Sequence, residues 1–414
     1  MSVRSRIGLA TVAVALCLTT WGCESKQERP PLAGHPAEEA KPLADEPLAT
    51  FRDQLLTMAF DTASAIPVDP HIKDRSRAQE AVIATCLTLG QPVRAGGYVE
   101  QMSTWRQGAA YADLAAYCAR KGHADEADTY LALAARAMEQ ADDWQKDRIR
   151  VAMARVHAWL GRGAQADELL AGVEAAEVGK VNSVAVQQCQ DEDFDLQVEA
   201  LDQLVATGQF DTIRNALESY TQLFNRFYGD PARQALAEQR IRAAWGPLPL
   251  LIKLDLLMAM ARSALDHGEP APALLLVNET QRLMDEATWP PEHRIVLVAR
   301  LATLRYRAGD QDQARSDCGA ALALFATERE SIVNIDRAET LCSPAEAYQA
   351  MGDAAAALAV YKQAVEQGVV NPNSRPRAED LSATCLSMAL HGAEPDAELW
   401  NRIRQIRAGL GQPW

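Results

Sequence analysis

Few residues of this chain stand at spacings that support metal binding or catalysis. The acidic run at residues 191–195 has alternating carboxylates, like the first half of a calcium-binding loop. A complete loop of that kind needs glycine at its sixth position and glutamate at its twelfth, and this chain has Leu196 and Asp202 there. A solvated linker or a helix start therefore explains the run better, because carboxylates near a helix N-terminus are stabilised by the helix dipole.

The histidines and cysteines form no familiar catalytic or metal-binding motif. The seven histidines are scattered singly, and the eight cysteines include no CxxC or CxxCH pair, which leaves zinc ribbons, thioredoxin-type redox sites and c-type haem attachment without support. No HExxH, GxSxG, Walker or GxGxxG motif is present either. The sequence therefore predicts no enzyme, cofactor or metal, and the cysteines are interpreted as small packing residues.

The charge balance excludes partners that need a basic surface. The chain has 56 acidic and 41 basic residues, a formal net charge of -15, and no run of five basic residues. Phosphate backbones and anionic lipid surfaces both require a concentrated basic patch. We expect no nucleic-acid binding, and any attachment to a membrane must come from another source.

The N-terminus has the pattern of an export signal. A short basic start precedes a mostly apolar run from Ile7 to Leu18, which is too short to span a bilayer as a helix. Gly22 and Cys23 follow, and the segment resembles a bacterial lipoprotein signal peptide. The resemblance implies that residues 1–22 are removed, that Cys23 is lipidated, and that the protein is sorted to the outer membrane facing the periplasm. Ordinary secretion is the alternative.

The next segment, residues 23–50, has the composition of a solvated tether. It is rich in proline, alanine and charge and has no apolar periodicity that could bury a face. A semi-extended chain of this length could hold a folded body about 30 Å or more from a bilayer.

A glycine-centred unit recurs through residues 51–395. Each unit has a helix-like stretch, a glycine and, five residues later, a small or apolar residue that opens the core of a second helix. Glycine ends a helix in the left-handed conformation without a Cβ penalty, and small residues let antiparallel helices approach closely. The glycines and their partner positions are Gly90 and Ala95, Gly122 and Ala127, Gly161 and Ala166, Gly208 and Ile213, Gly268 and Ala273, Gly309 and Ala314, Gly352 and Ala357, and Gly392 and Ala397.

The unit around Gly122 resembles the tetratricopeptide repeat (TPR) in the residue types on its two helices. The resemblance implies an all-α fold, a right-handed α-solenoid of about eight TPR-like hairpins, with residues 396–414 as a C-terminal capping helix and tail. An irregular α-solenoid of another family is the alternative. The residues that carry the likeness are Tyr111, Leu114, Ala115 and Cys118 on the first helix and Ala127, Leu131 and Ala134 on the second.

Most gaps between these glycines are longer than the family's repeat of about 34 residues, and one is much longer. Gly208 and Gly268 are 60 residues apart. We expect an irregular insertion at residues 225–249.

By the same resemblance, four arginines on first helices face the concave groove of the solenoid: Arg120, Arg155, Arg262 and Arg307. Guanidinium groups bind carboxylates through two parallel hydrogen bonds, so this stripe could take an acidic peptide or a terminal carboxylate. Pairing with neighbouring acidic residues is the competing explanation. Trp159, near the end of a first helix, could anchor a partner or cover the end of a hairpin.

These features predict a protein-interaction scaffold of the bacterial cell envelope that binds a peptide or protein partner in its concave face. One alternative is an envelope enzyme or solute-binding protein with a site in residues 209–267. Another is a structural spacer whose repeats self-associate. The residues that could line the site of the first alternative are Asp230, Arg233, Glu238, Arg240 and Trp245.

Overall fold

A computed structural model describes residues 42–173, 184, 186–187 and 189–414. All of them except Pro42 belong to one compact unit, Leu43–Trp414. Their regular structure is helical, and none of them lies in a β-strand, so the predicted all-α class is confirmed. The predicted signal peptide, Cys23 and most of the expected tether lie outside the described residues. No described helix is long and apolar enough to cross a membrane.

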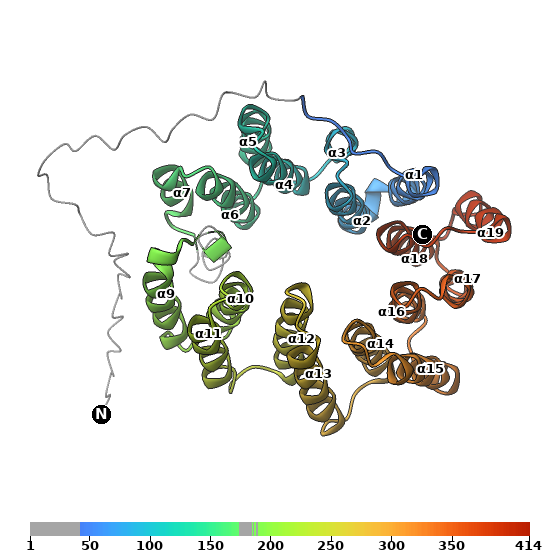
Figure 1. Ribbon diagram of the computed structural model, residues 1–414. Coiled ribbons are helices and arrows are strands. Elements are labelled where there is room, and N and C mark those ends of the chain that lie inside the picture. Colours follow the sequence, from blue (N-terminus) through green and yellow to red (C-terminus); the bar gives the residue numbers. More distant parts are fainter. Residues whose placement is uncertain (1–41, 174–183, 185, 188) are drawn as a thin grey trace, which may run out of the picture. The chain divides into compact units, whose positions relative to one another are not determined.

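Within this compact unit the helices form an inner and an outer layer, seen end-on in Figure 1. The inner helices are α2 (Val68–Thr88), α4 (Arg106–Lys121), α6 (Asp143–Trp159), α10 (Phe210–Arg226), α12 (Leu250–Asp266), α14 (Pro291–Arg307), α16 (Arg337–Ala350) and α18 (Ser374–His391). The outer helices are α1 (Thr50–Ala65), α3 (Pro92–Val99), α5 (Ala124–Glu139), α7 (Gly163–Leu170), α9 (Phe194–Ala206), α11 (Pro231–Ala244), α13 (Pro270–Asp285), α15 (Gln311–Glu328), α17 (Ala354–Val369) and α19 (Ala397–Ala408). Each inner helix contacts the next in the series α10, α12, α14, α16, α18, α2, α4 and α6.

Glycine sets the turns as the sequence predicts. All eight predicted glycines follow a helix and have φ between 69° and 95°. At Gly122 this conformation ends α4, and His123 N donates a hydrogen bond to Cys118 O at 2.9 Å. Seven of the eight partner positions are buried. Ala397 is exposed, and that prediction is wrong because α19 packs through the face around Ile403 instead.

The segment at residues 225–249, expected to be irregular, contains the regular helix α11, so this prediction is wrong. α11 packs against α10. Its first turn is set by Asp230, whose side chain accepts hydrogen bonds from the backbone of Ala232 at 3.1 Å and Arg233 at 3.2 Å, with Pro231 as the first helical residue. Aspartate caps and N-terminal prolines both favour a helix start. This hairpin therefore needs no left-handed glycine.

The N-terminal helix packs against the last inner helix. α1 lies along α18, and α2 also contacts α18, so the two ends of the compact unit are adjacent in Figure 1. Small residues allow the close approach: Ala59 and Ala63 are fully buried, and Ser382 Oγ donates to Ala59 O at 3.2 Å. One buried apolar cluster consequently includes residues from both ends of the chain. The C-terminal helix α19 lies on α17 and α18, where a cap is expected, but α18 is not a free end.

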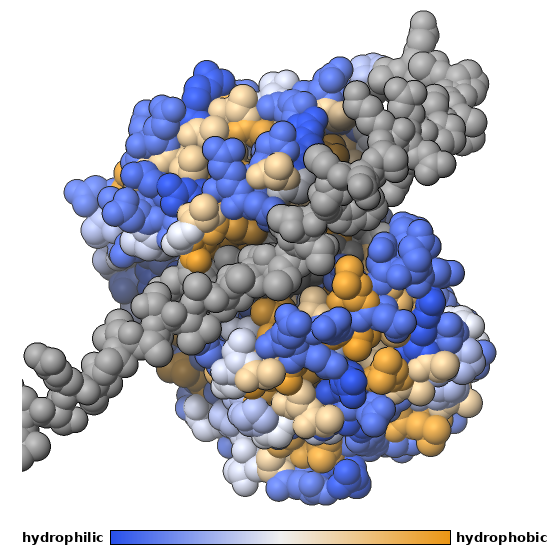
Figure 2. Space-filling model, turned by 90° about the vertical axis from the view of Figure 1, so that its left-hand side faces the viewer, coloured by the Kyte–Doolittle hydropathy of each residue, from blue (hydrophilic) through white to orange (hydrophobic). Residues whose placement is uncertain are grey.

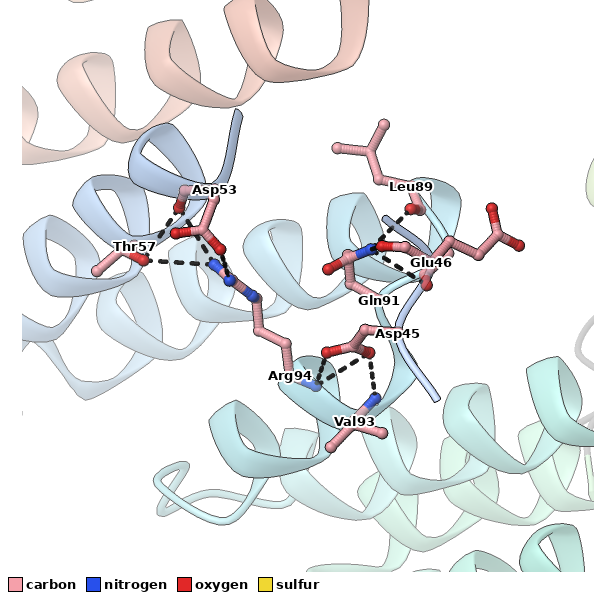
Figure 3. A network of polar contacts seen from close by, with 9 residues as sticks. Asp45, Glu46, Asp53, Thr57, Leu89, Gln91, Val93 and Arg94 are labelled. Atoms are coloured by element: carbon pink, nitrogen blue, oxygen red, sulfur yellow. Dashed lines mark hydrogen bonds and ion pairs between the residues drawn. The ribbon is translucent and has the colours of Figure 1, made fainter. Parts of the chain in front are cut away.

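The segment Leu43–Ala49 precedes α1 and is held against the start of α3 by hydrogen bonds (Figure 3), and we call it the docked segment. The Asp45 carboxylate accepts hydrogen bonds from the first free backbone N–H groups of α3, including that of Arg94 at 3.2 Å. Gln91 Nε2 donates to a backbone carbonyl of the docked segment at 2.7 Å. The Arg94 side chain forms an ion pair with Asp53 on α1. The end of the segment expected to be a solvated tether is therefore packed.

Gly122→Ala is expected to lower the free energy of unfolding by about 1 kcal/mol, because alanine is strained at positive φ. Space is not the cause, since no atom lies within 4 Å of the added Cβ. Gly319→Ala is the matched control: Gly319 lies inside α15 with equally open surroundings, and alanine there should raise the free energy of unfolding by about 0.5–1 kcal/mol. Urea denaturation measures both, and effects of the same sign would contradict this account.

Ala59→Leu is expected to overpack the contact between α1 and α18 and to lower the free energy of unfolding by about 1–3 kcal/mol. Hydrogen exchange should accelerate in α1 and α18 and stay unchanged in α12 and α13. Gln54→Leu, which adds the same side chain to the exposed face of α1, should change neither quantity. Similar behaviour of the two variants would exclude close packing at this contact.

Candidate functional site

The side of the inner helices that faces away from the outer layer is charged, and we call it the inner face. Its charged residues recur seven positions apart, which is two helical turns. The four predicted arginines each occupy the second position of such a pair. The pairs are Asp113 and Arg120 on α4, Arg148 and Arg155 on α6, Asp255 and Arg262 on α12, and Arg300 and Arg307 on α14.

Ion pairs connect the inner faces of α12 and α14. Arg300 lies 2.8 Å from Asp255, and Arg307 lies 2.7 Å from Asp266. Both pairs are partly exposed, so each contributes only about 0–1 kcal/mol to stability. Arg307 thus has an intramolecular carboxylate partner, as the competing explanation requires. Arg262 is exposed on α12, one turn before Asp266.

The predicted arginines of α4 and α6, Arg120 and Arg155, affect the pKa of Asp113. Although this side chain is exposed, the neighbouring helices limit the water around it, and this desolvation raises its pKa from 3.8 to about 6. Arg155 and Arg120 oppose the rise in pKa, and Glu80 adds to it. The Arg155 Nε atom is buried, without a hydrogen-bond partner in the part of the chain that the structure describes. Three of the predicted arginines therefore have a carboxylate nearby: Arg307 forms an ion pair with Asp266, and Arg120 and Arg155 act electrostatically on Asp113.

Trp159 lies at the C-terminal end of α6. It is half-buried and packs against the main apolar cluster. This position fits the covering of a hairpin end, the second of the two roles that the sequence suggests.

The five residues considered for a site within 209–267 do not converge. Arg233 pairs with Asp191 at 3.1 Å, and Arg240 pairs with Asp202 at 3.0 Å, so both face α9 and the turn before it. Glu238 is bonded instead to Arg242 on the side of α11 that faces α13. Asp230 caps α11, and Trp245 lies beneath the Arg242 guanidinium. A helix points side chains at these spacings in different directions, so the expectation of one groove lined by these five residues is wrong.

The acidic run at residues 191–195 forms a short 3-10 turn, η1 (Asp191–Asp193), and the start of α9. The Asp193 carboxylate accepts a hydrogen bond from the backbone of Gln190 at 3.3 Å. Among the residues that the structure describes, no three His, Cys, Asp or Glu side chains are grouped so that they could hold a metal ion.

The six described cysteines are buried and unbridged. Burial raises the pKa of the Cys86, Cys118 and Cys385 thiols to about 12. These thiols are therefore protonated at neutral pH, which agrees with their interpretation as packing residues.

No protein-family model matches the chain, and no curated protein matches its sequence. A function for the chain is therefore inferred from its inner face, because four inner helices present charged side chains there.

Asp113→Asn is expected to flatten the dependence of stability on pH. The folded-state pKa of Asp113 is about 6, above the value of 3.8 in the unfolded chain, so the folded state binds this proton more tightly. That contribution to stability is present below about pH 4 and is lost as the pH rises through about 6. Wild type should therefore lose more stability than the variant between pH 4 and 7 in urea denaturation. Solvent screening at an exposed carboxylate keeps the difference small, and identical pH profiles would contradict the raised pKa.

Proposed function

We propose that this chain is a lipid-anchored scaffold of the bacterial cell envelope that binds a carboxylate-rich peptide on its inner face. In this proposal the hairpins form a right-handed, TPR-like α-solenoid and the chain catalyses no reaction. The observation that carries the proposal is the recurrence of arginine on the inner face: four inner helices each present one there, two residues before the terminal glycine at Arg120 and Arg307 and six residues before it at Arg155 and Arg262.

The local charge of the inner face supports an acidic partner. The inner face has three arginines and one aspartate on α4 and α6, and three arginines and two aspartates on α12 and α14. The arginines are therefore in excess on both pairs of helices. Guanidinium groups bind carboxylates through charge-assisted, two-point hydrogen bonds. Two of the other inner helices differ, since α16 and α18 present Glu339, Glu346 and Glu379, the last of which pairs with Arg375 at 2.8 Å. A peptide with charges of both signs would therefore be held in one orientation.

The contact between α1 and α18 also bears on the kind of partner. It joins the first and last hairpins, so the inner layer curves back on itself (Figure 1). A narrow extended peptide fits such a surface better than a folded domain does. TPR-like arrays offer extended surfaces of this kind rather than preorganised catalytic pockets.

The position of the docked segment is compatible with a lipid anchor at Cys23. Leu43–Ala49 lies on the outer helices α1 and α3. A tether reaching this segment would therefore not cross the inner face. About twenty residues at roughly 3 Å each span up to about 60 Å, enough for the inner face to meet periplasmic partners while Cys23 stays in the outer membrane.

The test is affinity capture from detergent-solubilised cells with three versions of the full chain. The first is wild type, and the second carries Arg155→Glu, Arg262→Glu and Arg307→Glu. The third makes the same charge change on outer helices, with Arg136→Glu, Arg315→Glu and Arg404→Glu. We expect one partner, quantified by mass spectrometry, to be retained by wild type and by the outer-helix control, and to fall by about tenfold or more with the inner-face variant because carboxylates there repel it.

Other outcomes would contradict the proposal. Equal recovery with all three versions would remove the inner face as the site. Equal loss with both triple variants would assign the effect to net charge. Recovery of no specific partner would favour the self-associating spacer or the enzyme. Thermal melting by circular dichroism confirms that each variant is folded.

A further inference from the structure

A second candidate surface lies on the outer layer, in a groove between α11 and α13. The side of the molecule that carries α9 and α11 is mostly hydrophilic, with apolar patches between the charged residues (Figure 2). The groove has an open volume of about 300 Å³, and α10 and α12 form its floor. On α13 it extends from Pro272 to Glu279, which corresponds to about two helical turns.

The floor of this groove and part of its α13 wall are apolar. Phe224 and Ala264 lie at its base, and Leu275 and Leu276 line the α13 side. Leu275 is 72% exposed, more than any other large apolar side chain in the described part of the chain. At the edge of the groove the Tyr228 ring stacks on His267, with ring centroids 4.5 Å apart and planes within 3°. An exposed leucine in a groove lined by such apolar and aromatic side chains gains by contact with an apolar side chain that displaces its water.

The groove as a whole carries an excess of negative charge, from Glu238 on α11 and Glu279 on α13. Arg242 on α11 donates to both carboxylate oxygens of Glu279 at 2.6 and 2.8 Å and to Glu238 at 2.8 Å. Two carboxylates thus share one guanidinium group, which leaves one negative charge uncompensated. Glu269 lies close enough to Tyr228 to help raise the pKa of that phenol, after the larger effect of burial. A basic group is therefore the charge that complements this groove.

We propose that this groove binds a short amphipathic segment of another protein, with an apolar side chain placed against Leu275 and a lysine or arginine placed against Glu238 and Glu279. The groove is two turns long, has an apolar floor with Leu275 beside it, and carries one carboxylate on each wall, which are features that recognise an amphipathic helix by its apolar face and flanking basic residues. The ion pair between Arg242 and Glu279 joins the two walls, so the groove keeps its width without a partner. The groove lies on outer helices and does not depend on the function proposed for the inner face.

The test uses a displayed library of randomised helical peptides selected on the full chain. Selection on wild type is followed by removal of peptides that also bind a Leu275→Asp variant. We expect the enriched sequences to share apolar residues on one face flanked by lysine or arginine. One enriched peptide, measured by isothermal titration calorimetry, should bind the Leu275→Asp and Glu238→Gln variants at least about tenfold more weakly than wild type.

Leu196→Asp is the matched control, because Leu196 is 66% exposed on α9 and lies outside the groove. This variant, and the inner-face variant with Arg155, Arg262 and Arg307 changed to glutamate, should bind the peptide as tightly as wild type. Both leucines are exposed, so neither substitution should disturb folding, and thermal melting checks this. The proposal is overturned if no peptide is enriched, if enriched peptides lack basic residues, or if Leu196→Asp weakens binding as much as Leu275→Asp.

Discussion

A helical hairpin of this chain leaves an apolar face that only a neighbouring hairpin can cover, and the arrangement of the whole compact unit follows from that constraint. Along the series from α10 to α6, each inner helix covers the next. The last helix of such a series normally needs a polar outer face, because no further hairpin covers it. Here α1 covers α18 instead, through Ala59, Ala63 and Ser382, and α3 holds α1 in place through the pair between Arg94 and Asp53.

The local parts of the fold are readable from the sequence because they depend on short-range conformational rules. A glycine at the end of an amphipathic stretch predicts a left-handed turn, and at Gly122 and seven other positions this is found. The turn between α10 and α11 is missed because Asp230 and Pro231 perform the same task by capping and by a fixed φ. At Gly208 the left-handed turn follows an outer helix and precedes an inner one, so glycine alone does not identify the layer.

Contacts between distant segments are not readable in this way. Nothing in the residues of α1 shows that they pack against α18, because small and aliphatic residues at helical spacing are compatible with many neighbours. The same limit applies to the inner face. The seven-residue period places Arg262 and Arg307 on exposed faces, but the pairing of Arg307 with Asp266 depends on how α12 and α14 stack. The groove beside Leu275 arises between two outer helices and has no signature within either one.

The two proposed surfaces carry opposite local charges within one acidic chain, and ionic strength decides how far the net charge matters. A formal net charge of -15 repels an acidic peptide at long range, but charges more than about 8 Å apart are largely screened at physiological salt. A peptide close to the inner face therefore experiences mainly Arg120, Arg155 and Arg262. A basic segment near Glu238 and Glu279 is attracted at every distance, so its approach is the one that added salt slows more. One chain can in this way hold an acidic and a basic partner on opposite layers, because the layers separate the two sets of charges.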